Sequence, residues 1–135
     1  MMETISFKST QQRQILVITD EVRKVVKASG IQEGLCVVFN PHSTAGLTIN
    51  SYLDPATAQD MIEDVDRIVP TRTNFHHVFD TPSDASGHIK TSLVGSHLTI
   101  IIENGDFVFG HAQGIMFWEF DGPRERKVHV KLMKG

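Results

Sequence analysis

Apolar residues recur at alternate positions, or in short unbroken runs, along most of the chain, and this pattern is typical of β-strands. The segments that show it are residues 5–8, 15–18, 35–39, 47–50, 98–102, 107–109, 114–120 and 127–132. Asn104-Gly105 lies between two of these segments and is a strong signal for a hairpin turn. Asp121-Gly122-Pro123 joins the last two strands, so the pattern predicts consecutive hairpins toward the C-terminus.

Two other stretches predict helices, because their apolar residues recur three and four positions apart. Around residues 20–29, Thr19 or Asp20 supplies a capping oxygen and Gly30 allows a left-handed end. The second helix is expected at residues 55–69, where an aspartate and a proline open it. Four of its acidic residues are expected to face water: Asp60, Glu63, Asp64 and Asp66.

Residues 71–87 show little periodicity and contain many turn-forming residues. We expect a loop there of about seventeen residues, a length that is uncommon unless the loop is functional or disordered. A short helical segment is expected at residues 88–95. Eight strands against two or three helices favour an α+β fold, mainly an antiparallel sheet or sandwich. Without a linker or repeat, the 135 residues are expected to form one domain, residues 1–135.

Composition narrows the classes of partner. A formal net charge of −3 argues against binding nucleic acid through phosphate neutralisation. Cys36 is the only cysteine, which excludes an intrachain disulfide, and its apolar neighbours indicate a buried side chain. The start of the sequence lacks a secretory-signal pattern, and the longest apolar run is far too short to span a membrane. We therefore expect a cytoplasmic protein that binds neither nucleic acid nor membrane.

His42, His77 and His88 are the candidate catalytic residues, since each lies beside turn-forming or small polar residues rather than in an apolar run. Histidines on loops held by rigid strands commonly form binding or catalytic sites. Three neutral imidazoles that converge would suit a zinc-type site with one position open for water or substrate. If one or two are protonated, they would instead serve as general acid–base groups and anion binders. Their wide separation along the chain is compatible with both roles.

Polar residues near the histidines could bind a phosphate group through hydroxyls, an ammonium group or amides. Each also has a purely structural explanation, such as a turn for Asp84 or an exposed helix position for Lys90. The candidates for substrate binding are Ser43, Thr44, Asn50, Asp84, Lys90, Ser92 and Gln113.

Three longer motifs resemble the YjbQ-like proteins, a family long uncharacterised and often labelled secondary thiamine-phosphate synthase. They are HSTAGLTIN at residues 42–50, GHIKTSLVG at residues 87–95 and EFDGPR at residues 119–124. The resemblance covers essentially the whole chain in the same order. The chain departs from the family pattern at His111 and Ala112, which stand where the family usually has threonine and tryptophan.

This resemblance implies a YjbQ-like fold built on antiparallel sheet, assembled as a homotrimer, with a histidine-lined pocket near the subunit contacts. The implied reaction joins a pyrophosphorylated pyrimidine to a thiazole phosphate with the help of a divalent cation, so the implied partner is a phosphorylated small molecule. Magnesium prefers oxygen ligands, whereas His42, His77 and His88 suit zinc, and both ions stay open as cofactors. Metal-assisted hydrolysis is a second candidate reaction.

A trimer that binds a metal or an anionic metabolite without catalysis is the alternative to an enzyme. In a homotrimer, whether catalytic or not, Glu119 is expected to form an ion pair with Arg124 or Arg126 of another subunit rather than to take part in catalysis.

Overall fold

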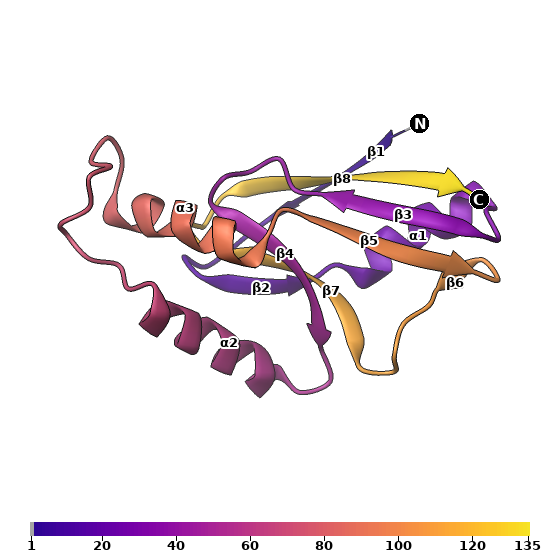
Figure 1. The fold of residues 1–135 in the computed structure, drawn as a ribbon, viewed down its shortest axis with the longest axis horizontal. Coiled ribbons are helices and arrows are strands. Elements are labelled where there is room, and N and C mark those ends of the chain that lie inside the picture. Colours follow the sequence, from indigo (N-terminus) through magenta and orange to yellow (C-terminus); the bar gives the residue numbers. More distant parts are fainter. Residues whose placement is uncertain (1) are drawn as a thin grey trace.

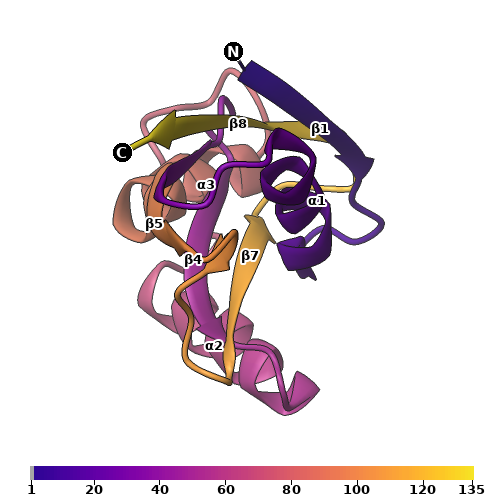
Figure 2. The ribbon, with the colours of Figure 1, turned by 90° about the vertical axis from the view of Figure 1, so that its right-hand side faces the viewer.

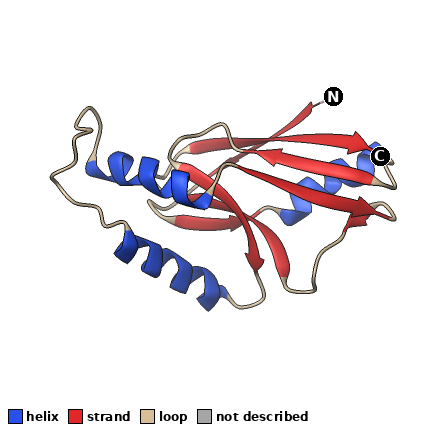
Figure 3. Ribbon diagram, in the orientation of Figure 1, coloured by secondary structure: helices blue, strands red, loops and turns tan. Residues whose placement is uncertain are grey.

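The structure is a computed structural model that describes residues 2–135. Its elements in chain order are β1 (Met2–Lys8), β2 (Gln14–Val17), α1 (Thr19–Ser29), β3 (Gly34–Phe39), β4 (Ala45–Ser51), α2 (Pro55–Ile68), α3 (Pro82–Val94), β5 (His97–Glu103), β6 (Asp106–Phe107), β7 (Gln113–Glu119) and β8 (Glu125–Lys134). The strands form two sheets, one in the order β1-β8-β3-β5-β6 and one in the order β2-β7-β4 (Figures 1 and 3). Every strand pair is antiparallel, which confirms the expected α+β fold.

The hydrophobic core lies between the two sheets and α1, which sits beneath β1 and β8 and beside β7 (Figure 2). Cys36 and Val38 of β3 face this core with no exposed surface, while Leu35 and Phe39 on the same strand face outward. Burial of one such apolar side chain contributes about 1.5–3 kcal/mol to stability. Burial also raises the pKa of the Cys36 thiol to about 12, as expected for a structural rather than a reactive cysteine.

Local sequence signals predicted several element ends correctly. Gly30 ends α1 with a left-handed φ of 71°. Asn104 and Gly105, with φ values of 53° and 76°, close the hairpin between β5 and β6. The Asp54 carboxylate caps α2 by accepting a 2.9 Å hydrogen bond from a backbone amide. Thr19, in contrast, is the first residue of α1 rather than its cap, and its hydroxyl accepts a hydrogen bond from β7.

The expected loop over residues 71–87 is wrong in its second half, because α3 begins at Pro82. The Thr81 hydroxyl caps this helix by accepting a 3.2 Å hydrogen bond from the Asp84 amide. Small and polar residues favour loops in isolation, but here they let α3 pack closely on the segment around Thr44 of the same chain. A Cβ atom added at Gly87 would lie 3.3 Å from the Thr44 side chain. Tertiary packing therefore overrides local propensity in this segment.

The expected hairpin between the last two strands is also wrong, because β7 and β8 belong to different sheets. β8 pairs with β1 on one side and β3 on the other, whereas β7 pairs with β2 and β4. The turn after Glu119 therefore carries the chain from one sheet to the other. This crossing brings the start of β8 beside the loop that follows β3, where His42 lies.

α2 lies on the outside of the molecule and has no fully buried residue. Its acidic face is not entirely solvated, because Asp66 forms an ion pair with Lys90 of α3. Lys90 is only 1% exposed, so the structural alternative considered for it, an exposed helix position, is wrong. This ion pair ties α2 to α3, the helix that carries the candidate site. Within residues 2–135, no helix combines the length and apolar composition needed to cross a membrane.

Candidate metal centre

His77, Asp84 and His88 form a compact group of potential metal ligands at the start of α3. The His77 Nε2 atom lies 2.9 Å from Asp84 Oδ2, and the His88 Nε2 atom lies 3.0 Å from the same oxygen. One ligand atom from each residue falls within 4.8 Å of the other two. Two of the three predicted histidines therefore meet at a carboxylate.

The helix explains how these side chains reach each other. Asp84 lies in the first turn of α3 and His88 one turn later, a spacing that places both side chains on the same face. A carboxylate in the first turn is also stabilised by the helix dipole. His77 comes from the segment between α2 and α3, which folds back so that its ring approaches Asp84. The rings of His77 and His88 contact each other with centroids 5.2 Å apart.

The second nitrogen of His88 determines where its proton lies. His88 Nδ1 is 3.1 Å from the backbone carbonyl oxygen of Ser43, and a carbonyl can only accept, so Nδ1 carries a proton. In a neutral ring, Nε2 then presents a lone pair to the Asp84 carboxylate. Two acceptors at 3.0 Å repel each other unless a proton or a cation lies between them. The contact therefore requires either a proton shared between His88 Nε2 and the Asp84 carboxyl group or a bound cation at this point.

Two imidazoles and one carboxylate form a ligand set that suits zinc or another transition metal better than magnesium. Ligand atoms around a tetrahedral ion with bonds of 2.0–2.1 Å lie about 3.3 Å apart, slightly more than the two nitrogen–oxygen separations found here. The three ligand atoms lie within 4.8 Å of one another, so small side-chain adjustments would bring all of them within bonding distance of one ion. The side chains of His77 and His88 are 42% and 39% exposed, whereas that of Asp84 is 9% exposed. The carboxylate thus forms the floor of a site whose outer side is open to water or a ligand.

His42 does not join this group within the chain. Its Nε2 accepts a 3.0 Å hydrogen bond from the backbone amide of Lys127, just beyond the point where β3 ends beside β8. The imidazole therefore accepts the hydrogen bond from Lys127 that a neighbouring strand would otherwise accept. Burial, followed by the charge of Arg126, lowers the pKa of His42 below its ordinary value. A neutral ring that accepts at Nε2 carries its proton at Nδ1. A role for His42 in the site stays a prediction.

Four of the seven residues expected to bind substrate belong to the group or lie next to it along the chain or by contact. Asp84 is a member of the group itself. Ser43 contributes its carbonyl oxygen to His88, while its side chain is exposed. The Ser92 hydroxyl donates to the carbonyl oxygen of His88 one turn back in α3. Thr44 is buried directly after Ser43.

The remaining three residues of the expected set have partners elsewhere. Lys90 is paired with Asp66 on the opposite side of α3. Asn50 is exposed on β4, and its side chain accepts a hydrogen bond from the next backbone amide. The Gln113 side chain accepts a hydrogen bond from the Gly110 amide at the start of β7. None of these contacts involves the histidine group.

Glu119 forms its ion pair within the chain, so the expected pairing with an arginine of another subunit is not what the structure shows. Its carboxylate is fully buried and accepts two hydrogen bonds from Arg126, one of them 2.8 Å long from Nε. Burial alone raises the pKa of the Glu119 carboxyl, but hydrogen bonds from Arg126, from Ser9 and from a backbone amide outweigh it. The pKa is therefore held below its ordinary value. Arg124 pairs instead with Asp121 at 2.7 Å.

Asn40 is a buried residue that the sequence reasoning missed. Its Oδ1 accepts a 2.9 Å hydrogen bond from the His42 amide, and its Nδ2 donates a 2.6 Å hydrogen bond to the Ala45 carbonyl oxygen. These bonds fix the loop that presents the Ser43 carbonyl to His88. The available signal was the Asn-Pro pair before His42, which is typical of a tight turn.

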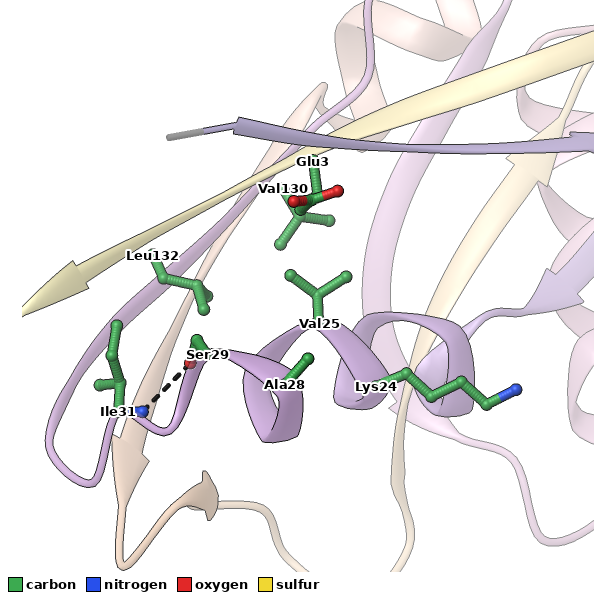
Figure 4. Close-up of a pocket in the computed structure, with 8 residues that line it drawn as sticks. All are labelled: Glu3, Lys24, Val25, Ala28, Ser29, Ile31, Val130 and Leu132. Carbon is green, nitrogen blue, oxygen red and sulfur yellow. Dashed lines mark hydrogen bonds between the residues drawn. The ribbon is translucent and has the colours of Figure 1, made fainter.

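A separate cavity of about 460 Å³ lies between α1 and the edge of the larger sheet, at strands β1 and β8 (Figure 4). Its walls are mostly apolar side chains, with Glu3 and Lys24 as its charged residues. The lining residues are Glu3, Lys24, Val25, Ala28, Ser29, Ile31, Val130 and Leu132. This cavity shares no lining residue with the histidine group, and it offers no set of metal ligands.

The fold and the site together define an antiparallel α+β protein with a histidine–carboxylate group at a helix N-terminus. The sequence profile of the YjbQ-like UPF0047 proteins matches residues 3–135. The chain therefore belongs to the YjbQ/UPF0047 family. Among its relatives, the UPF0047 protein YugU of Bacillus subtilis is 37% identical over 98% of this chain and 99% of that protein. A UPF0047 protein of Methanocaldococcus jannaschii is 39% identical over 98% of this chain and 94% of that protein.

Solved structures agree with this assignment. A crystal structure of an uncharacterised conserved YjbQ/UPF0047 protein from Clostridium acetobutylicum superposes with a TM-score of 0.91 at 44% identity, covering 97% of this chain and 99% of that chain. A hypothetical protein from Aeropyrum pernix superposes with a TM-score of 0.94 at 27% identity, covering 100% of this chain and 99% of that chain. The family is thus established for this chain, while these relatives carry no named activity.

Proposed function

We propose that the protein is a metal-dependent enzyme in which His77, Asp84 and His88 hold one divalent transition-metal ion that acts on a phosphorylated small molecule. The observation that supports this proposal is the approach of both Nε2 atoms to a single Asp84 oxygen. The protonated Nδ1 of His88, bonded to a carbonyl, leaves Nε2 as the ligand atom; metal-bound histidines usually donate their other ring N–H to such an acceptor.

Three protein ligands leave positions for water or for an oxygen of the substrate. A bound ion of this kind would polarise a phosphate oxygen or lower the pKa of a bound water to about 7. The buried Asp84 would balance part of the ion's charge, and the exposed edges of His77 and His88 would admit the substrate from solvent. This open arrangement suits a catalytic site better than a closed structural one.

The substrate class follows from the resemblance of the sequence motifs rather than from the geometry. A thiamine-phosphate synthase-like transfer is the first reaction to assay, and hydrolysis of a phosphate ester is the second. The choice of metal follows from the ligands, since two imidazoles favour zinc over magnesium.

Metal analysis of the purified protein, followed by activity measurements, tests the proposal. We expect about one zinc or similar ion per chain, loss of activity after chelation and recovery on adding that ion rather than magnesium. A protein that takes up no transition metal would overturn the metal centre. A protein that binds metal but converts neither a pyrimidine pyrophosphate with thiazole phosphate nor a simple phosphate ester would be the non-catalytic binding module.

We also propose a homotrimer as the assembly. Leu35 lies opposite both Ile101 and Met133 in the larger sheet, and these three side chains are 38%, 59% and 54% exposed. Phe39 continues the same outward face at 46% exposure. A contiguous apolar sheet face of this kind commonly marks a contact between subunits. Val78 and Phe79, exposed directly after His77, place further apolar surface beside the metal centre.

A further inference from the structure

We infer that the buried Glu119–Arg126 ion pair positions the proposed metal ligand His88, by holding the main chain whose carbonyl oxygen orients the His88 ring. This inference rests on the proposed metal centre for its functional meaning, although the contacts themselves are independent of any metal. Neither residue touches the ligand group directly. Both therefore act as positioning residues.

The first link is the ion pair itself. Glu119 is 0% exposed and Arg126 is 5% exposed, and the guanidinium meets the carboxylate through two of its nitrogens. The carboxylate is satisfied further by the Ser9 hydroxyl at 2.6 Å and by the Asp121 amide at 3.1 Å. A pair with this many partners holds a single orientation of the guanidinium.

The second link runs from Arg126 to the loop after β3. Arg126 Nη2 donates to the Thr44 carbonyl oxygen at 3.2 Å and to the Thr44 hydroxyl at 2.9 Å. The same carbonyl oxygen also accepts a hydrogen bond from the Phe120 amide at 3.1 Å. Thr44 is thus held through both its main chain and its side chain, while Asn40 bonds to His42 and Ala45 on either side of it in the loop.

The third link joins this loop to the metal ligand. Ser43 directly precedes Thr44, and its carbonyl oxygen accepts the hydrogen bond from His88 Nδ1 at 3.1 Å. Gly87, the residue before His88, packs against Thr44 so closely that an added Cβ would lie 3.3 Å from it. A shift of Thr44 therefore moves both the acceptor of His88 and the surface on which its helix rests.

A purely stabilising role does not require an ion pair here, because apolar residues of similar volume often stabilise a buried site equally well. What an apolar pair cannot supply is the two hydrogen bonds to Thr44. Fold stability and the orientation of His88 are therefore separate properties, and one substitution can affect them differently.

The test uses the double variant Glu119→Leu with Arg126→Met, which removes the pair without leaving a buried charge. Arg126→Lys is the second variant, because it keeps a cation beside Glu119 but lacks the planar fork needed to reach both Glu119 and Thr44. The matched control is Arg124→Lys, which alters a neighbouring arginine–carboxylate pair that makes no contact with Thr44. Melting temperature and circular dichroism identify which variants fold.

Two readouts follow for each folded variant. The first is the exchange rate of the His88 Nδ1 proton in ¹⁵N spectra of the metal-free protein, at a pH where both ring nitrogens are protonated. This proton should exchange slowly with water in the wild type and the control, because the Ser43 carbonyl oxygen accepts it, and fast in the variants. The second is the zinc dissociation constant from competition with a chromophoric chelator, which should rise about 10- to 100-fold in the variants and stay unchanged in the control.

A folded variant with the wild-type exchange rate of the Nδ1 proton and a zinc dissociation constant within about twofold of wild type would overturn the inference. If the wild-type protein binds no zinc, the proposed function fails. The exchange rate of the His88 Nδ1 proton still decides the positioning role in that case, because it is measured without metal.

Discussion

At the scale of single residues, the candidate site depends on one buried carboxylate that two imidazoles share. Asp84 is the least exposed of the three ligands, and its Oδ2 is the atom that both Nε2 atoms approach. When the His88 ring is neutral and its Nδ1 donates to the Ser43 carbonyl oxygen, its Nε2 carries no proton. The functional meaning of the site therefore depends on the charge of Asp84.

Replacing Asp84 by asparagine should remove that charge while keeping the size of the side chain. We expect zinc affinity to fall by more than about 100-fold, because a residue that binds the metal directly is lost rather than one that only orients a ligand. The free energy of unfolding should fall by only about 0.3–1 kcal/mol, the amount that a negative charge in the first turn of a helix contributes. Asp80→Asn, in the exposed segment just before α3, is the control. Unchanged zinc affinity in Asp84→Asn would reject this aspartate as a ligand.

His42 offers a prediction about pH. Burial, then the charge of Arg126, lowers the pKa of His42 in the folded protein below the ordinary value of 6.5. Between these two values the unfolded chain binds more protons, so this histidine's contribution to stability is present above pH 6.5 and is lost as the pH falls through the folded pKa. Urea denaturation at several pH values should show a smaller loss of stability on acidification for His42→Gln than for wild type. Equal losses would contradict this account.

At the scale of elements, the parts that were predicted correctly are those determined by neighbouring residues. The caps of α2, the end of α1 at Gly30 and the Asn104-Gly105 hairpin depend on interactions a few residues apart. The early start of α3 and the separation of β7 from β8 depend on contacts between distant segments, such as Gly87 against Thr44. A pattern along the chain cannot report such contacts.

The difference between local signals and contacts between distant segments also decides which parts of the candidate site could be predicted. His77 and His88 were candidates because each lies beside turn-forming or small polar residues, and loops held by rigid strands commonly carry binding or catalytic residues. The position of His42 was not, because it depends on β3 ending early beside β8 and leaving the Lys127 amide without a strand partner. The ion pair of Glu119 with Arg126 within the chain likewise depends on where the chain passes from β7 to β8.

The Thr81 cap yields a prediction for α3. Thr81→Ala removes the hydroxyl that accepts a hydrogen bond from the Asp84 amide, so the free energy of unfolding should fall by about 1 kcal/mol. Because Asp84 lies in the turn that frays, zinc affinity should fall as well. Thr73→Ala, an exposed threonine in the preceding segment, serves as the control in the same urea titration. A cap variant as stable as the control would show that packing alone holds the start of this helix.

At the scale of the whole molecule, the two faces of the larger sheet have different surroundings. One face covers the core with α1, while the other presents Leu35, Phe39, Ile101 and Met133 to solvent. Apolar side chains that lie directly opposite each other across three strands form a continuous surface rather than isolated exposed residues. Because β1 and β6 are open edges of this sheet, a closed assembly would also cover surface that is otherwise available for unwanted pairing.

The homotrimer gives the last prediction. Three chains of 15.1 kDa give about 45 kDa, which light scattering coupled to gel filtration should find at micromolar concentration. Ile101→Glu places a charge in the centre of the exposed apolar face, so burying it between subunits becomes unfavourable and the mass should fall toward that of one chain. Circular dichroism should remain that of the folded protein, because this side chain faces away from the core. Gln59→Glu on the outer surface of α2 adds the same charge and should leave the trimer intact. A wild-type protein that is monomeric at these concentrations would contradict the proposed assembly.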